Sequence, residues 1–254
     1  MTSTAYSVSS EGTLPNAPNS LVHSWHNFQN KASPAQCYQD ILQRSNSDVI
    51  IYLHDDVTIH DEDWMTKIMT PFLWDDDCVA VGFGGATGLG NADLYRKPYN
   101  IWNLARTGYR SNQTDAEVHG LRETGIVQVA VLDAFCMAVK REWLLSRQTY
   151  KHFTTGRMYG IDDIGHHYTA METGWPVSHL THHCLDLWLG CEAARDGKKI
   201  FMTGVSCTHH GGGTSTKDSY KEAGWLQGGT MEDDHRIPHE WIQYEYRGVL
   251  PIQL

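Results

Sequence analysis

Several features that define common protein classes are missing from this chain of 254 residues. No apolar run approaches the ~18 residues of a membrane span, and the N-terminal MTSTAYSVSS lacks the charged and apolar regions of a signal peptide. The six cysteines are scattered and form no CxxC pair, so neither a disulfide framework nor a redox motif is indicated. These absences predict a soluble cytoplasmic protein with reduced thiols.

Positive charge is also scarce, with 20 basic against 30 acidic residues and a formal net charge of −10. This balance argues against a surface that binds nucleic acid mainly by neutralising phosphates, although it allows a local basic cleft. No internal repeat and no linker divides the chain, and its length suits one α/β domain with a large buried core. We therefore expect a single domain over residues 1–254.

Histidine and aromatic residues, by contrast, are abundant. The 15 histidines include three adjacent pairs, which could mark a metal site, although one such pair more often serves packing or the surface. An apolar fraction of 41%, with 9 Trp and 12 Tyr residues, is typical of a folded globular protein. Most of the chain should therefore pack.

The first half of the chain predicts a helix, a strand and a second helix. Ser33 and Pro34 open the helix SPAQCYQDILQRS as N-cap and first helical residue. Its apolar face comprises Ala35, Tyr38, Ile41 and Leu42. The run DVIIYLHDD predicts a central parallel strand covered on both faces, and DEDWMTKIMTPFLW predicts a helix with acids in its first turn.

Further strands are predicted for CVAVGFGGA, which ends in glycines, and for KKIFMTGVSC. TGIVQVAVLDAFCMAVKREWLL predicts a strand, a turn at Asp133 and a helix starting near Arg141. CLDLWLGCEAARDG predicts a helix closed by Gly197. This order of elements implies right-handed crossovers and an α/β fold with a mostly parallel central sheet flanked by helices.

Three side chains able to bind metal follow the predicted strand in DVIIYLHDD. Because side chains alternate along a strand, His54 and Asp56 should point to one side and Asp55 to the other. Ligands collect at the carboxyl ends of strands in open α/β sheets, and Mn²⁺ or Mg²⁺ binds carboxylate oxygen readily. The alternative is that Asp55 and Asp56 cap the next helix, but capping needs only one of them. We therefore favour a metal site.

A second candidate for metal and phosphate binding is THHGGGTS, after the predicted strand KKIFMTGVSC. An imidazole from His209 or His210 would lie beside Gly211 and Gly212, whose backbone can approach a phosphate closely. Glycine loops are common. In combination with the HDD tip of another strand of the same sheet, however, either histidine becomes a plausible third metal ligand.

Two acids are open to a structural or a chemical role. Asp186 lies in the opening turn of a predicted helix, where it either complements the helix dipole or acts as a general base toward a hydroxyl. Asp133 ends a strand in an apolar neighbourhood, where it either caps a turn or holds a substrate hydroxyl.

These pieces, in this order, resemble the GT-A fold nucleotide-sugar glycosyltransferases of the family-two type, especially relatives whose metal motif reads His-x-Asp-Val. YLHDDV stands where that family has a DxD-like motif that holds a divalent metal on the donor diphosphate. His54 replaces the first acid of that motif, and Asp56 takes the place of the last and more important ligand. A histidine after the last sheet strand completes the metal site in many members, which matches His209 or His210.

The resemblance extends to the acids. LDAFCMAVKREWL, with Asp133, matches a segment whose acid lies near the donor sugar and the acceptor. The family's acidic helix start, Glu-Asp-x-Asp-Leu, is matched by residues 183–187, where Asp186 is the one acid that remains. Asp186 is therefore the expected general base, and Asp133 is its rival.

The fold implied by the resemblance is one GT-A-like domain. Residues 1–60 would form the nucleotide-binding part, and residues 87–254 the acceptor side with an insertion and a C-terminal tail. AYSVSSEG and LVHSWHN would be shortened nucleotide-binding strands. The residues expected near the donor are Ser9, Glu11, Asn27, Asp55, Gly84, Gly85, Gly211 and Gly212.

The activity implied is metal-dependent, inverting transfer of a hexosyl or pentosyl group from a nucleotide-diphosphate sugar, with UDP-sugar favoured, to an acceptor hydroxyl. The acceptor stays open between glycan, lipid, protein and modified nucleobase, and we expect the aromatic, Arg-containing segment 89–122 to select it. One alternative is a zinc hydrolase, against which the lack of an HExxH motif argues. The other is a non-catalytic nucleotide-sugar or carbohydrate-binding module, which the loss of the Glu-Asp pair favours.

Overall fold

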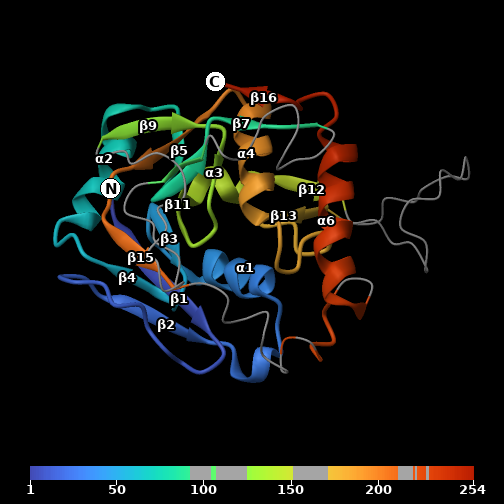
Figure 1. Ribbon diagram of the computed structural model, residues 1–254, viewed down its shortest axis with the longest axis horizontal. Helices are drawn as coiled ribbons and strands as arrows, with labels where there is room; N and C mark the ends of the chain where they lie inside the picture. The colour runs from blue at the N-terminus through green and yellow to red at the C-terminus, as the bar shows by residue number, and fades with distance from the viewer. Residues whose placement is uncertain (92–103, 107–124, 151–170, 211–219, 221, 227–228) are drawn as a thin grey trace, which may run out of the picture.

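A seven-stranded sheet forms the centre of the molecule (Figure 1), whose computed structural model describes residues 1–91, 104–106, 125–150, 171–210, 220, 222–226 and 229–254. In order across the sheet, the strands are β2 (Val22–His26), β1 (Ser3–Ser9), β3 (Val49–Leu53), β11 (Cys136–Lys140), β5 (Cys78–Gly82), β14 (Lys199–Thr203) and β9 (Ile126–Val129). Strands β2, β1, β3, β5 and β14 run in one direction, whereas β11 and β9 run in the other. The predicted α/β fold with a mostly parallel sheet is confirmed.

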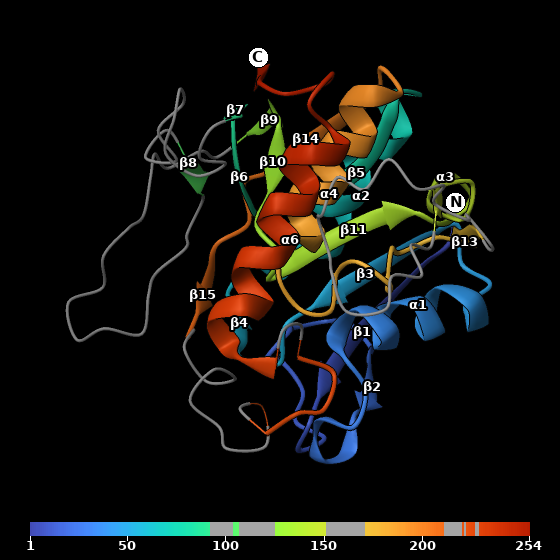
Figure 2. The ribbon, with the colours of Figure 1, turned by 90° about the vertical axis from the view of Figure 1, so that its right-hand side faces the viewer.

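Different helices cover the two faces of this sheet (Figures 1 and 2). Residues of β3 alternate between two cores, with Ile50 and Tyr52 in one and Val49, Ile51 and Leu53 in the other. The helices α1 (Pro34–Arg44), α3 (Arg141–Leu145), α4 (Leu185–Arg195) and α6 (Met231–Glu245) contribute to the first core, and α2 (Trp64–Trp74) to the second. The prediction that β3 is covered on both faces is confirmed, but only its pairing with β1 is parallel, because β11 runs antiparallel to it.

The start of α1 follows directly from its sequence. The Ser33 side chain accepts a hydrogen bond from the backbone N of Gln36, and Pro34 opens the helix as predicted. Four of its buried residues are those of the predicted apolar face. The end of α4 is also as expected, since Gly197 adopts φ +66°, a left-handed conformation that favours glycine after a helix.

The prediction of acids in the first turn of α2 is wrong. The helix begins at Trp64, so the acids of DEDWMTKIMTPFLW precede it, and the N-cap Asp63 makes no side-chain capping bond. Asp61 instead accepts hydrogen bonds from Lys67 Nζ (2.9 Å) and from the backbone N of Ser206 (2.8 Å). These long-range partners hold Asp61 outside the helix and tie this segment to the chain before β15 (Cys207–His209).

Two predicted strands are each divided between two sheets. CVAVGFGGA forms β5 and then β6 (Gly84–Ala86), which pairs with β10 (Val131–Leu132) and β8 (Leu104–Arg106). KKIFMTGVSC forms β14, which ends at a tight turn where Val205 N donates to Thr203 O. The chain then enters β15, which pairs with β4 (Val57–Ile59) outside the main sheet.

The remaining regular elements lie at the periphery. They are the 3-10 helix η1 (Phe28–Asn30), the paired strands β12 (Gln148–Tyr150) and β13 (Met171–Thr173), and the paired strands β7 (Gly88–Leu89) and β16 (Ile252–Gln253). Within the ranges given above, none of the helices combines the length and apolar character needed to cross a membrane.

Candidate functional site

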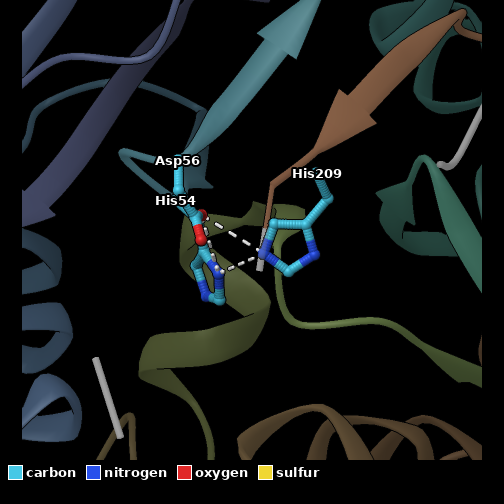
Figure 3. Close-up of side chains that lie close together, drawn as sticks. All are labelled: His54, Asp56 and His209. Carbon is cyan, nitrogen blue, oxygen red and sulfur yellow. Dashed lines mark hydrogen bonds and ion pairs between the residues drawn. The ribbon is translucent and has the colours of Figure 1, made fainter. Parts of the chain in front are cut away.

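A candidate metal site lies where β3 ends and the chain turns into β4. The backbone N of His54 donates to Phe135 O (2.9 Å), which fixes the beginning of this turn. Strand β15 pairs antiparallel with β4, in a register that sets His209 opposite Val57. His209 therefore lies beside the side chains of His54 and Asp56, although it is far from them in the sequence (Figure 3).

These three side chains form what we call the tip cluster. His209 Nε2 lies 3.2 Å from Asp56 Oδ1 and 3.4 Å from His54 Nδ1, and the latter two atoms are 3.9 Å apart. The ring of Phe135 stacks on that of His209, with centroids 5.0 Å apart and planes inclined by 20°. The three potential ligand atoms all lie within 4.8 Å of one another, so small side-chain movements would bring them around one ion.

The electrostatics of the tip cluster fit a divalent cation. Burial alone would raise the pKa of Asp56, but the close approach and charge of His209, with the charge of His54, lower it to about 2. Burial and the neighbouring His209 also lower the pKa of His54, so a carboxylate and a neutral imidazole are present at neutral pH, as metal binding requires. The buried Oδ1 of Asp56 lies 3.2 Å from His209 Nε2 and 3.9 Å from His54 Nδ1, which places one carboxylate oxygen beside both imidazoles, as a cation shared by the three side chains requires.

Asp55 points away from the tip cluster, as expected, but not because of strand alternation. Strand β3 ends at Leu53, so residues 54–56 belong to a turn. Asp55 Oδ2 accepts a hydrogen bond from Thr13 Oγ1 (2.7 Å), and Thr13 in turn bonds to the hydroxyl of Ser9 (2.7 Å). Asp55 thus joins the tip of β3 to the loop that follows β1.

The predicted general base lies at the start of α4. Its N-cap Cys184 has the left-handed φ of 66°, and Asp186 Oδ1 accepts a hydrogen bond from the backbone N of Leu187 (2.9 Å). Burial and the nearby charge of Asp133 raise the pKa of Asp186 to about 7. A carboxyl group that titrates near neutral pH is well suited to exchange protons with a substrate.

Asp133 lies in the turn between β10 and β11. Its backbone N donates to Gly84 O (2.9 Å), and its Oδ1 accepts a long hydrogen bond from the backbone N of Phe135 (3.5 Å). The turn-capping role that the sequence left open is therefore observed. Its charge also contributes to the raised pKa of Asp186.

One cavity of about 300 Å³ joins the tip cluster to Asp186. It is lined by Val8, Ser9, Ser10, Asn27, Asn30, Pro34, Tyr38, His54, Asp55, Asp56, Ala134, His182, His183, Cys184, Leu185 and Asp186. Three of these are acids, and among the described lining residues there is no lysine or arginine. A negatively charged ligand would therefore be repelled by this part of the wall unless a cation accompanied it.

The residues predicted to contact a nucleotide fall into two groups. Ser9 and Asn27 line the cavity, but both side chains brace loops: Ser9 Oγ accepts from the backbone N of Thr13 (3.1 Å), and Asn27 bonds to the N and O of Ala32. Glu11 is exposed and is not among the lining residues.

Of the four glycines predicted near the donor, the two that the structure describes, Gly84 and Gly85, do not line this cavity. Gly84 and Gly85 are buried in β6, and a Cβ on Gly85 would lie 2.5 Å from Val131 O, so strand packing requires glycine there. Gly211 and Gly212 lie outside the described residues. His210 is exposed and bonds through Nε2 to Thr58 Oγ1 (3.1 Å), so the structure brings His209 and not His210 into the tip cluster.

His182 and His183 on the cavity wall belong to a second group of polar side chains, which was not predicted from the sequence. His182 Nδ1 and His183 Nε2 lie 2.7 Å and 3.1 Å from the hydroxyl of Tyr220, which donates to Asp234 Oδ2 (3.2 Å). Thr181 Oγ1 donates to the other oxygen of Asp234 (2.5 Å). We call these five residues the Tyr220 hub. The adjacent histidines were its only signal in the sequence, because Tyr220 and Asp234 come from distant segments.

Comparison with known proteins gives one family match. The model of the family described as "Glycosyltransferase like family" matches residues 16–157. A search of curated proteins found no match.

Two solved structures similar to this chain have low sequence identity to it. The structure of "GalNAc-T7 with UDP, GalNAc and Mn2+" is 12% identical with a TM-score of 0.43, covering 76% of this chain and 33% of that protein. The present chain thus spans about a third of that relative. A197 from STIV is 13% identical with a TM-score of 0.39, covering 84% of this chain and 87% of A197.

Proposed function

Because the chain belongs to the glycosyltransferase-like family, we propose that it transfers a hexosyl or pentosyl group from a nucleotide-diphosphate sugar to an acceptor hydroxyl in a metal-dependent, inverting reaction. One observation carries this proposal: the tip cluster and Asp186 share a single cavity whose described wall is acidic. UDP-sugars are the donors that we favour.

The tip cluster would hold the cation, with Asp56 and His209 as ligands and His54 as the third. When bound, Mn²⁺ or Mg²⁺ supplies the charge that stabilises a leaving diphosphate more in the transition state than in the ground state. The chain's own contribution is to present the Asp56 carboxylate and the neutral His54 imidazole from a turn held by the His54 N to Phe135 O bond, and the His209 imidazole from β15, where the Phe135 ring stacks on it. Without a cation, the acids on the wall disfavour a diphosphate.

Asp186 would take the proton of the acceptor hydroxyl as that oxygen attacks the anomeric carbon. Its pKa of about 7 leaves a large share of the side chain ionised at neutral pH, while keeping it basic enough to accept a proton. Asp133, which contributes to that raised pKa, would keep Asp186 reactive and remains the alternative base.

A thermal-shift screen of nucleotide sugars, with and without Mn²⁺, tests this function. We expect UDP-sugars to raise the melting temperature only when Mn²⁺ is present, because a ligand that binds the native state stabilises it by mass action. The donors that stabilise the protein are then incubated with glycan, lipid and peptide acceptors. Transfer to an acceptor supports the proposal, release of free sugar alone indicates a hydrolase, and binding without turnover indicates a non-catalytic module.

A further inference from the structure

The Tyr220 hub fixes which nitrogen of His182 carries a proton. Tyr220 donates its single hydroxyl hydrogen to Asp234, whose side chain is fully buried. With that hydrogen directed to Asp234, the Tyr220 oxygen is left to accept from the nitrogen that lies 2.7 Å away, and this network assigns the proton of His182 to Nδ1. In neutral imidazole the other nitrogen, Nε2, then carries a lone pair and no hydrogen.

Two further observations direct His182 toward a ligand. His182 lines the cavity. Its pKa is lowered mainly by burial, then by the neighbouring His183, and also by His54 of the tip cluster. Nε2 of His182 makes no hydrogen bond in the part of the chain that the structure describes. The residue that carries this acceptor atom thus lines the same cavity as His54 and Asp56 of the tip cluster.

The neighbouring His183 is placed differently. Its Nε2 also lies near the Tyr220 hydroxyl, at 3.1 Å, but its ring packs against His235 of α6, with centroids 4.9 Å apart. Because the Tyr220 hydroxyl has one hydrogen, which goes to Asp234, both His182 Nδ1 and His183 Nε2 donate to the Tyr220 oxygen. A protonated nitrogen cannot bind a metal. The hub therefore favours hydrogen bonding over a second metal site, although its ligand atoms lie within 4.8 Å of one another.

We propose that His182 Nε2 accepts a hydrogen bond from a hydroxyl of the donor sugar, and that Tyr220 and Asp234 are positioning residues that set its tautomer. This inference rests on the proposed function, since a diphosphate at the tip cluster would place the attached sugar further along the same cavity, toward His182 and Asp186. A site built to bond a hydroxyl discriminates against sugars that lack it, so His182 would contribute to donor selection.

The tautomer can be measured without any substrate. In nitrogen-15 correlation spectra of the histidine rings, we expect His182 of the intact protein to show the Nδ1–H tautomer, and Tyr220→Phe to shift it toward the Nε2–H form. An Nε2–H tautomer in the unmodified protein would overturn the proposal. So would ring shifts typical of coordination when Zn²⁺ is added to a variant that lacks Asp56, because His182 would then be a metal ligand.

Calorimetric binding of UDP and of UDP-sugars, each with Mn²⁺, tests the contact itself. We expect His182→Ala to weaken binding of the preferred UDP-sugar about 3- to 10-fold, as for one lost hydrogen bond, and to leave UDP binding unchanged. His23→Ala, an exposed histidine on β2, is the matched control and should change neither. Unchanged UDP-sugar binding in His182→Ala overturns the contact but leaves the proposed function intact, whereas failure of the unmodified protein to bind UDP overturns both.

Discussion

The tip cluster and the Tyr220 hub face the same cavity with similar side chains, yet their hydrogen bonding differs. In the tip cluster, a buried oxygen of Asp56 faces two imidazole nitrogens directly, at 3.2 Å and 3.9 Å. In the hub, each oxygen of Asp234 accepts a hydrogen bond, one from Thr181 and one from Tyr220. The first arrangement leaves ligand atoms available to a cation, and the second uses them to hold the protein in one conformation.

The comparison shows why histidine and aspartate content alone does not identify a metal site. Both groups bring three potential ligand atoms within 4.8 Å of one another. They differ in whether a hydroxyl group lies between those atoms: Tyr220 fills that place in the hub. The first two predictions below each change one side of this difference, and the later two test Asp186 on the same cavity and the hydrogen-bonded turn beside the tip cluster.

The largest effect is expected from removing the carboxylate of the tip cluster. Asp56→Ala should lower the rate of sugar transfer by about 10³-fold or more, because a metal clamp on a leaving phosphate is worth several kcal/mol in the transition state. The variant should also lose the Mn²⁺-dependent rise in melting temperature. Asp76→Ala, which removes an exposed aspartate between α2 and β5, is the matched control and should retain both properties. Full activity in Asp56→Ala would contradict a catalytic metal at this cluster.

Substitutions in the Tyr220 hub should instead lower the stability of the protein. Asp234 is fully buried, and Asp234→Ala would leave the hydroxyls of Thr181 and Tyr220 buried without their acceptor. We expect a loss of about 2–4 kcal/mol in the free energy of unfolding, measured by urea denaturation. Asp234→Asn keeps one acceptor oxygen, so its free energy of unfolding should fall by less. If Asp234→Ala unfolds like the unmodified protein, the hub is not a structural unit.

Local features of the fold could be predicted from the sequence because their causes are local. The N-cap and first-turn proline of α1 and the apolar run of β3 act over a few residues, and both elements form where expected. The division of CVAVGFGGA and KKIFMTGVSC between sheets could not be predicted. It depends on which strands meet in space, and apolar runs carry no information on their partners.

In the candidate site, too, local features could be predicted from the sequence, whereas contacts between distant segments could not. The tip of β3 is visible in the sequence, but the choice of His209 over His210 is made by the register of β15 against β4, where a shift of one residue would exchange them. Gly85 was expected near the donor, yet contact with Val131 O is what requires glycine there. A glycine that allows close approach does not reveal what approaches it.

Asp186 links activity to stability through its raised pKa. As a base it must be ionised, so the transfer rate should rise with pH through about 7. Because the folded-state pKa lies above the unfolded value, the contribution of Asp186 to stability is fully present below about pH 4 and is lost as pH rises through 7.

The corresponding test is Asp186→Asn, which removes the ionisation. We expect a transfer rate lower by on the order of 10²-fold, as for a lost general base, together with a free energy of unfolding higher than that of the unmodified protein by on the order of 2 kcal/mol at pH 8 and by little at pH 4. Denaturation at the two pH values measures this difference. Equal stability of the two proteins at pH 8 would show that burial does not raise the pKa of Asp186.

The smallest effect is expected at Thr13, which connects the tip of β3 to the β1 loop without contacting the cation ligands. Thr13→Val keeps the shape of the side chain but removes its hydrogen bonds to Asp55 and Ser9. We expect a loss of about 1 kcal/mol in the free energy of unfolding and only a few-fold weaker Mn²⁺ and UDP binding, since the turn loses a brace but no ligand. Thr70→Val, whose hydroxyl bonds to Thr66 O within α2, is the matched control and should leave binding unchanged. A loss of binding as large as that in Asp56→Ala would mean that Asp55 and Thr13 belong to the metal site itself, and the distinction between ligand and brace at this turn would be wrong.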